Sequence, residues 1–172
     1  EINHWCAGEV MYQGTDMRTG SALEIYRSGV GRCGEEAVFV VNVMRSAGIP
    51  ARPVYVPRWS HCDDNHAWVE VWCDGDWHYL GACEPEAVLD KGWFTNAASR
   101  AMMIGSRWYD RAMPDEKVIG KDGMNRIINL LGKYAKTRWI TITVEDLDGT
   151  PAAGAKVRAE VMNYGEFSPI AK

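Results

Sequence analysis

The pattern of apolar positions predicts one buried helix in the first half of the chain. The segment Cys33–Ala47 reads CGEEAVFVVNVMRSA, and its valines favour a strand by propensity. Fifteen residues is long for a strand, however, and Gly48 followed by Pro50 is typical of a helix end. Apolar residues recur at helical spacing: Ala37, Val40, Val41, Met44 and Ala47. We therefore predict a buried helix that begins at Cys33.

Short strands are predicted to follow this helix. Arg52–Val56 is the first, and Ala67–Trp72 and Trp77–Ala82 flank Asp74-Gly75, a dipeptide typical of a two-residue hairpin loop. That loop fixes the pairing of the two strands. It places four pairs on one face of the hairpin: Trp72 with Trp77, Glu70 with Tyr79, Trp68 with Gly81 and His66 with Cys83. The opposite face is apolar.

The remainder of the chain has weaker patterning. The segment 90–123 is interpreted as mixed helix and loop, and 125–135 is ambiguous between strand and helix. Trp139–Val144 and Ala155–Val161 then alternate as strands around a turn-forming sequence. This resembles the opening of a β-sandwich, although 36 residues cannot complete one. We predict a first domain over 1–136 and a partial sandwich over 137–172, with packing of the second hairpin on the first domain as the alternative.

Composition and charge exclude several classes of protein. Hydrophobic residues make up 47% of the 172 residues and charged residues 24%, as in ordinary globular domains. The longest apolar run has five residues, so no membrane-spanning segment is expected. Residues 1–90 contain fourteen acidic and only six basic side chains, which argues against a nucleic-acid partner. The chain starts at Glu1 without a signal-peptide pattern, and we expect a processed or excised piece.

The five cysteines are an odd number, so at least one thiol is expected to be free or to pair between molecules. If Cys33 is the free thiol, up to two disulfides could form among Cys6, Cys62, Cys73 and Cys83, although the sequence implies none. Cys62 and Cys83 could form one such pair. A zinc site formed by the segment from His61 to His66 with Cys73 and Cys83 is a minor alternative, because paired C-x-x-C spacing is absent. We expect no metal and no cofactor.

Cys33 and His66 carry the candidate chemistry. A cysteine at a helix N-terminus has a lowered thiol pKa, because free amides and the helix dipole stabilise the thiolate. Gly31 and Gly34 flank it and permit close approach of a substrate backbone. A base must lie within hydrogen-bond reach of such a nucleophile, and His66 opens a strand 33 residues later. By itself Cys33 would be read as a small buried apolar residue.

Three motifs together resemble the transglutaminase-like superfamily: G-R-C-G-E at 31–35, G-I-P-A-R-P-V at 48–54 and N-H-A-W-V-E-V-W at 65–72. The resemblance covers about Tyr26–Phe94 well and Trp5–Tyr12 weakly. It implies a papain-like α+β fold, in which a Cys-bearing helix packs on an antiparallel sheet, with Cys33 as nucleophile and His66 as general base. Residues 148–157 are similar to carboxypeptidase-regulatory-like β-sandwich domains. Members with this layout are often extracytoplasmic bacterial proteins, which implies a secreted, periplasmic or cell-surface location.

The third member of the expected catalytic triad departs from the family pattern. The superfamily usually has an Asp on the strand after the His strand, and Gly81 occupies the matching position here. Glu84 can serve only if the chain bends, which Pro85 makes reasonable. We expect Glu84 to orient His66, with Asp64, Asn65 or an ordered water as alternatives.

These residues predict a cysteine-dependent hydrolase or acyltransferase that acts on amide bonds of peptides or proteins through a thioester, with hydrolysis favoured. One alternative is an amidase similar to peptide:N-glycanases. The other is a catalytically impaired transglutaminase-like module for binding or scaffolding, which the glycine at position 81 permits.

Overall fold

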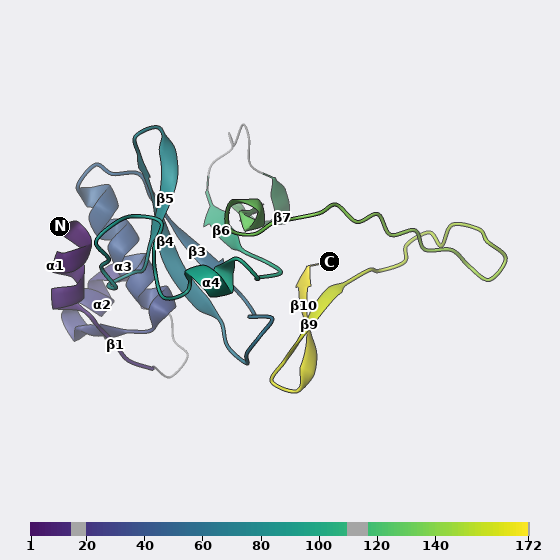
Figure 1. Ribbon diagram of the computed structural model, residues 1–172, viewed down its shortest axis with the longest axis horizontal. Coiled ribbons are helices and arrows are strands. Elements are labelled where there is room, and N and C mark those ends of the chain that lie inside the picture. Colours follow the sequence, from purple (N-terminus) through teal and green to yellow (C-terminus); the bar gives the residue numbers. More distant parts are fainter. Residues whose placement is uncertain (15–19, 110–116, 172) are drawn as a thin grey trace.

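A six-stranded antiparallel sheet forms the centre of the molecule (Figure 1). The computed structural model describes residues 1–14, 20–109 and 117–171. The order across the sheet is β5 (Asp76–Leu80), β4 (His66–Cys73), β3 (Ala51–Val56), β6 (Gly105–Trp108), β8 (Asn125–Asn129) and β7 (Val118–Asp122). With its helices, it forms the α+β architecture expected from the sequence.

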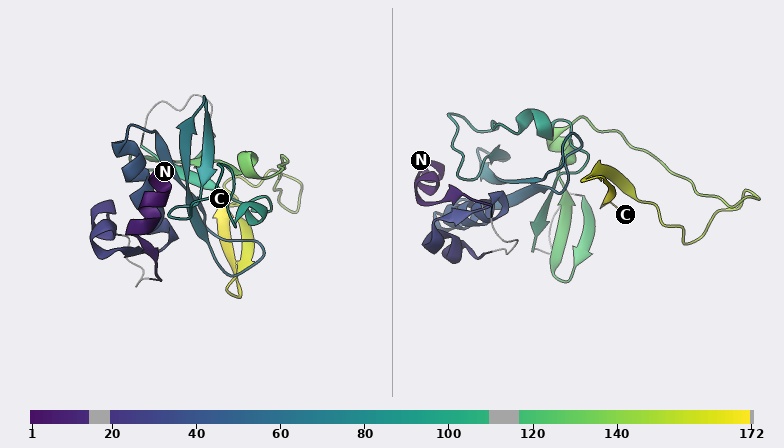
Figure 2. Two further views of the ribbon diagram at one scale, coloured as in Figure 1. Left: turned by 60° about the vertical axis from the view of Figure 1, so that its left-hand side comes forward. Right: turned by 90° about the horizontal axis from the view of Figure 1, so that it is seen from below.

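Three helices cover one side of β3 and β4: α1 (Ile2–Glu9), α2 (Ala22–Ser28) and α3 (Cys33–Ser46) (Figures 1 and 2). Two short parallel strands, β1 (Met11–Tyr12) and β2 (Val30–Gly31), lie beside them. Neither α1 nor α2 was predicted from the sequence. A signal for α2 was present, because Ser21 and Glu24 form a capping box in which each side chain bonds the other residue's backbone N–H.

Helix α3 confirms the prediction of a buried helix beginning at Cys33. The apolar side chains of Ala37, Val40 and Val41 are buried against the sheet. Glu35 is also buried, and its carboxylate accepts the backbone N–H groups of Arg32, at 2.8 Å, and Gly20, at 3.2 Å. It satisfies N–H groups at the entry to the helix and fixes the start of α3.

The β4–β5 hairpin has the predicted register. Trp72 pairs with Trp77 and Glu70 pairs with Tyr79. Asp74 and Gly75 both have positive φ, 51° and 86°, as a two-residue hairpin loop requires. The ladder stops at Leu80, so the expected pairing of His66 with Cys83 does not form. The chain instead turns back on itself from Gly81 to Glu84.

The other side of the sheet is covered by short helices, α4 (Thr95–Ala98) and α5 (Leu131–Tyr134). The interpretation of 90–123 as mixed helix and loop holds for 90–104, which contain α4, but it was wrong for strands β6 and β7; residues 110–116 lie outside the described part. Segment 125–135 contains both a strand, β8, and a helix, α5. Pairing with distant strands stabilised short segments that had no clear periodicity of their own.

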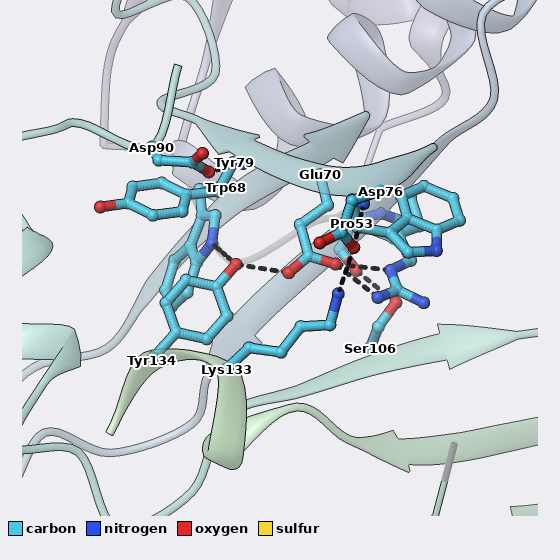
Figure 3. Close-up of polar contacts among 11 residues, drawn as sticks. Pro53, Trp68, Glu70, Asp76, Tyr79, Asp90, Ser106, Lys133 and Tyr134 are labelled. Atoms are coloured by element: carbon cyan, nitrogen blue, oxygen red, sulfur yellow. Dashed lines mark hydrogen bonds and ion pairs between the residues drawn. The ribbon is translucent and has the colours of Figure 1, made fainter. Parts of the chain in front are cut away.

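A buried polar network lies on this side of the sheet (Figure 3). Arg52 on β3 and Glu70 on β4 are 0% and 2% exposed, and Arg52 Nε donates to Glu70 Oε2 at 2.6 Å. The Tyr134 hydroxyl donates to Glu70 Oε1 at 2.6 Å and accepts the indole N–H of Trp68 at 2.9 Å. The network therefore ties α5 to the strand that begins at His66.

The C-terminal region contains one hairpin, of β9 (Ala159–Asn163) and β10 (Glu166–Ala171), after a long extended excursion (Figure 1). The prediction of a strand over Trp139–Val144 was wrong: the segment has no partner strand among the described residues, and Trp139 is 85% exposed. Buried Asn163 donates to the carbonyl oxygens of Trp59 and Cys62. The hairpin thus packs on the loop before His66, and the division at residue 136 stays a prediction.

None of the helices in the described ranges has the length and apolar character needed to cross a bilayer.

Candidate functional site

Cys33 is the first residue of α3, as the sequence analysis expected. The backbone N–H groups of Gly34 and of Ala67, on β4, both stabilise the thiolate form of Cys33. The Cys33 sulfur therefore lies next to the start of β4. A Cβ placed on Gly34 would meet no heavy atom within 4 Å, whereas one on Gly31 would lie 3.1 Å from Cβ of Glu35. Gly34 therefore borders open space, while Gly31 permits tight packing.

His66 is the first residue of β4 and is only 6% exposed. Its ring is surrounded by aromatic rings, with centroid distances of 4.6 Å to Trp93, 4.9 Å to Phe94 and 5.8 Å to Trp68. Within the described part of the chain, its buried Nε2 atom has no hydrogen-bond partner. The imidazole is therefore held by packing on its faces and not by a hydrogen bond at Nε2.

Two cavities of about 450 and 430 Å³ meet at Cys33 and His66, and Arg32 and Asn65 also line both. The first extends past Tyr55, Pro57 and Arg107, and the second past Tyr12, Asp64, Glu84 and Trp93. The structure thus brings Cys33 and His66 together, although they come from separate elements. A peptide lying through these cavities would pass beside both side chains.

Glu84 lies in the second of these cavities, so the bend that its predicted role required is present. A Cβ on Gly81 would lie only 2.6 Å from Oε2 of Glu84, so the Glu84 carboxylate occupies the space that a side chain at 81 would take. Both carboxylate oxygens accept the indole N–H of Trp93, each at 3.0 Å. Among the described residues, the carboxylate has no hydrogen bond to His66.

The two alternatives to Glu84 lie at the mouth of the site. Asp64 and Asn65 are both exposed, and the Asp64 carboxylate accepts the backbone N–H of Asn65 at 2.7 Å. Asp64 also acts on His66 through space, favouring the charged imidazolium. Neither residue satisfies Nε2 of His66.

The charge states of the pair differ from the sequence-based expectation. Burial raises the pKa of the Cys33 thiol above its ordinary value, and the N–H groups of Ala67 and Gly34 offset this only in part. Burial lowers the pKa of His66 to about 4. Desolvation outweighs the helix N-terminus, so at neutral pH the pair consists of a thiol and a neutral imidazole.

Glu36, on the first turn of α3, is a second buried carboxyl group beside the site and is 3% exposed. Burial, then the nearby charges of Glu84 and Glu35, raises its pKa to about 8. A carboxyl whose folded-state pKa lies above its unfolded value of 4.5 stabilises the fold fully below pH 4.5, and this contribution is lost as pH rises through 8.

Glu36→Gln should therefore become more stabilising as pH rises. We expect the free energy of unfolding of Glu36→Gln, relative to wild type, to increase by about 3–4 kcal/mol between pH 5 and pH 8, because glutamine stays neutral. Urea unfolding at several pH values measures this. Glu9→Gln, an exposed position on α1, is the control, and parallel pH curves for Glu36→Gln and wild type would contradict the prediction.

Other candidate sites from the sequence analysis are not assembled. All five cysteines are free thiols, so the Cys62–Cys83 pair is not formed. No group of three or more His, Cys, Asp or Glu side chains within the described ranges is placed to hold a metal ion. A larger cavity, of about 590 Å³, lies between α1 and residues 85–89 and includes none of Cys33, His66 and Glu84.

Comparison with known proteins agrees with this arrangement over the first half of the chain. Residues 1–82 match the family model of the transglutaminase-like superfamily. The resemblance carried by the cysteine and histidine motifs is thereby confirmed for this transglutaminase-like region, and Glu84 lies just beyond it. No match is found among curated protein sequences.

One solved structure is similar, that of a "putative cysteine protease" from Cytophaga hutchinsonii. The two share 20% sequence identity with a TM-score of 0.43, over 74% of this chain and 50% of that one. The present chain thus matches half the length of that protein.

Trp93 is the residue of the site that the sequence analysis did not identify. It stands in the irregular segment between β5 and α4, where neither helical nor strand periodicity placed it near His66. Its only sequence signal was the pair Trp93-Phe94 after a glycine, which is a weak one. Only the folded chain brings it to the site.

Proposed function

We propose that the chain is a cysteine-dependent enzyme that acts on amide bonds of peptides or proteins, with Cys33 as nucleophile and His66 as general base. The observation that carries the proposal is the meeting of both side chains at two open cavities, with the N–H of Ala67 beside the Cys33 sulfur. A nucleophile and base from separate elements at one cleft is the arrangement that acyl transfer needs.

The reaction proceeds in two halves. His66 takes the thiol proton of Cys33 as the sulfur attacks the carbonyl carbon of the substrate. The resulting oxyanion can accept hydrogen bonds from backbone N–H groups near the start of α3. Collapse breaks the C–N bond, and the imidazolium returns the proton to the leaving amine, which leaves a thioester on Cys33. Water, deprotonated by His66, then attacks the thioester and releases the acid and the free thiol.

Hydrolysis is proposed as the main fate of the thioester. Gly34 borders open space, and Tyr12 and Trp93 at the second cavity are 64% and 63% exposed. Water can therefore reach the acyl group. Transfer to an amine and removal of an amide from a glycosylated Asn are variants of the same chemistry at the same thioester.

A non-catalytic binding module is the second candidate. It is favoured by the raised pKa of the Cys33 thiol and by the Nε2 atom of His66, which has no hydrogen-bond partner among the residues that the structure describes, since neither feature activates the pair before substrate arrives.

A peptide-library assay separates the two. We expect incubation with mixed peptides to yield new amine ends and a thioester adduct on Cys33, detected by mass spectrometry after acid quench. Cys33→Ala is the control. Peptide binding without adduct or product would favour the binding module.

The pH profile provides a separate prediction. His66 must be neutral to act as base, and with a pKa of about 4 it stays neutral through pH 5, where an ordinary histidine is protonated. We expect the acid limb of kcat/KM to have its midpoint near pH 4. Iodoacetamide labelling of Cys33 should rise at a higher pH than that of an ordinary thiol, because burial raises the thiol pKa of Cys33. A kcat/KM midpoint near pH 6.5 would contradict the buried, neutral imidazole.

A further inference from the structure

Trp93 connects Glu84 to His66. Its indole N–H is bonded to both oxygens of Glu84, each at 3.0 Å, and its ring lies 4.6 Å from the His66 ring at an interplanar angle of 51°. Glu84 itself makes no hydrogen bond to His66 in the described part of the chain, and Nε2 of His66 is unpartnered. The physical path from the carboxylate to the imidazole therefore runs through the indole.

The position of Glu84 is determined by a turn that α1 holds in place. Glu84 N–H donates to Gly81 O at 3.2 Å, and Cys83 within this turn has a positive φ of 56°, which is uncommon for a residue with a Cβ. Asn3 bridges the turn, donating to Gly81 O at 2.9 Å and accepting from Cys83 N–H at 3.1 Å. A backbone clamped in this way presents the carboxylate at a defined point.

The indole needs such an anchor because most of its surface is free. Trp93 is 63% exposed, whereas the next residue, Phe94, is fully buried and packs on His66 and Trp68. An exposed aromatic ring samples several rotamers unless a directional contact selects one. The hydrogen bond to Glu84 is the contact that selects the rotamer in which the indole lies against the imidazole.

We propose that Trp93 is a positioning residue for His66 and that Glu84 acts on His66 through it, not by a direct hydrogen bond. Glu84 holds the indole, and the indole limits rotation of the imidazole whose Nε2 atom is not otherwise fixed. This inference rests on the proposed role of His66 as base, and it gives Glu84 a role that needs an acceptor oxygen but not a negative charge.

Four variants test the arrangement by their kcat/KM. Trp93→Phe keeps a ring but removes the N–H, and Glu84→Ala removes the acceptor. We expect a loss of up to about tenfold from each, as for one hydrogen bond. The double variant Trp93→Phe/Glu84→Ala should lose no more than the worse single variant. Glu84→Gln, which keeps an acceptor oxygen, should recover most of the loss seen in Glu84→Ala.

A direct role of the carboxylate gives the opposite results. Glu84→Gln would then be as impaired as Glu84→Ala, and the losses of the two single variants would multiply. Either result overturns the proposal. Trp72→Phe and Glu86→Ala serve as matched controls, since Trp72 is a part-exposed hairpin residue and Glu86 pairs only with Lys91 among the described residues.

A measurement without substrate separates failure of this inference from failure of the proposed function. The chain has four histidines, and His66 is assigned in ¹⁵N spectra by its loss in His66→Gln. We expect Trp93→Phe and Glu84→Ala to broaden or shift the His66 ring signals alike, with Glu84→Gln close to wild type. Unchanged His66 signals in Trp93→Phe would overturn the positioning role, whether or not the wild-type protein turns over peptides.

Discussion

Replacement of His66 by alanine is expected to lower kcat/KM about 1,000-fold, which is the usual contribution of a positioned general base. Cys33 depends on this base because burial raises its thiol pKa, and the thiol is not ionised at neutral pH. His66 supplies the one imidazole among the described residues that line the two cavities, where the other ionisable side chains apart from Cys33 and the tyrosines are arginines and carboxylates. The loss should therefore appear in kcat and not chiefly in KM.

His61→Ala is the matched control for this prediction. His61 is exposed and lies in the loop that leads to His66, where its ring contacts Trp59 at 5.5 Å, but it lines neither cavity. We expect its kcat/KM to stay within about twofold of wild type, as is usual for surface substitutions. A His66→Ala enzyme that keeps more than a tenth of wild-type turnover at pH 7 would exclude His66 as base.

Glu70→Ala is expected to destabilise the protein by about 3–5 kcal/mol, because it removes the carboxylate that pairs with the buried charge of Arg52. Arg52 is 0% exposed, and the Glu70 carboxylate also accepts the Tyr134 hydroxyl, so the substitution breaks the link between β3, β4 and α5 (Figure 3). Urea unfolding followed by far-UV circular dichroism measures the loss.

Two further variants make this result interpretable. Arg52→Met/Glu70→Leu removes both charges, and we expect it to recover most of the stability, since replacing a buried pair by apolar residues is often neutral or stabilising. Glu86→Ala breaks the exposed pair with Lys91, at 3.4 Å, and should cost less than about 1 kcal/mol. A Glu70→Ala variant within 1 kcal/mol of wild type would show that solvent reaches Arg52.

Sequence reasoning succeeded where local chemistry and hydrophobic periodicity agreed. Helix α3 followed from the helical spacing of its apolar residues and from the helix stop at Gly48 and Pro50, which act within a few residues. The register of the β4–β5 hairpin followed from Asp74-Gly75, because a two-residue loop permits one pairing. The segment 139–144 shows the limit: its alternating pattern favours a strand, but no described strand pairs with it.

The sequence by itself determined that a cysteine begins a buried helix and that a histidine begins a strand 33 residues later. Both are consequences of short-range patterning. Only the tertiary structure decided what surrounds them. Burial raises the pKa of Cys33 and lowers that of His66, and a turn clamped by Asn3 brings Glu84 into the space beside Gly81. Desolvation and contacts between distant segments depend on how the whole chain packs, which no local pattern records.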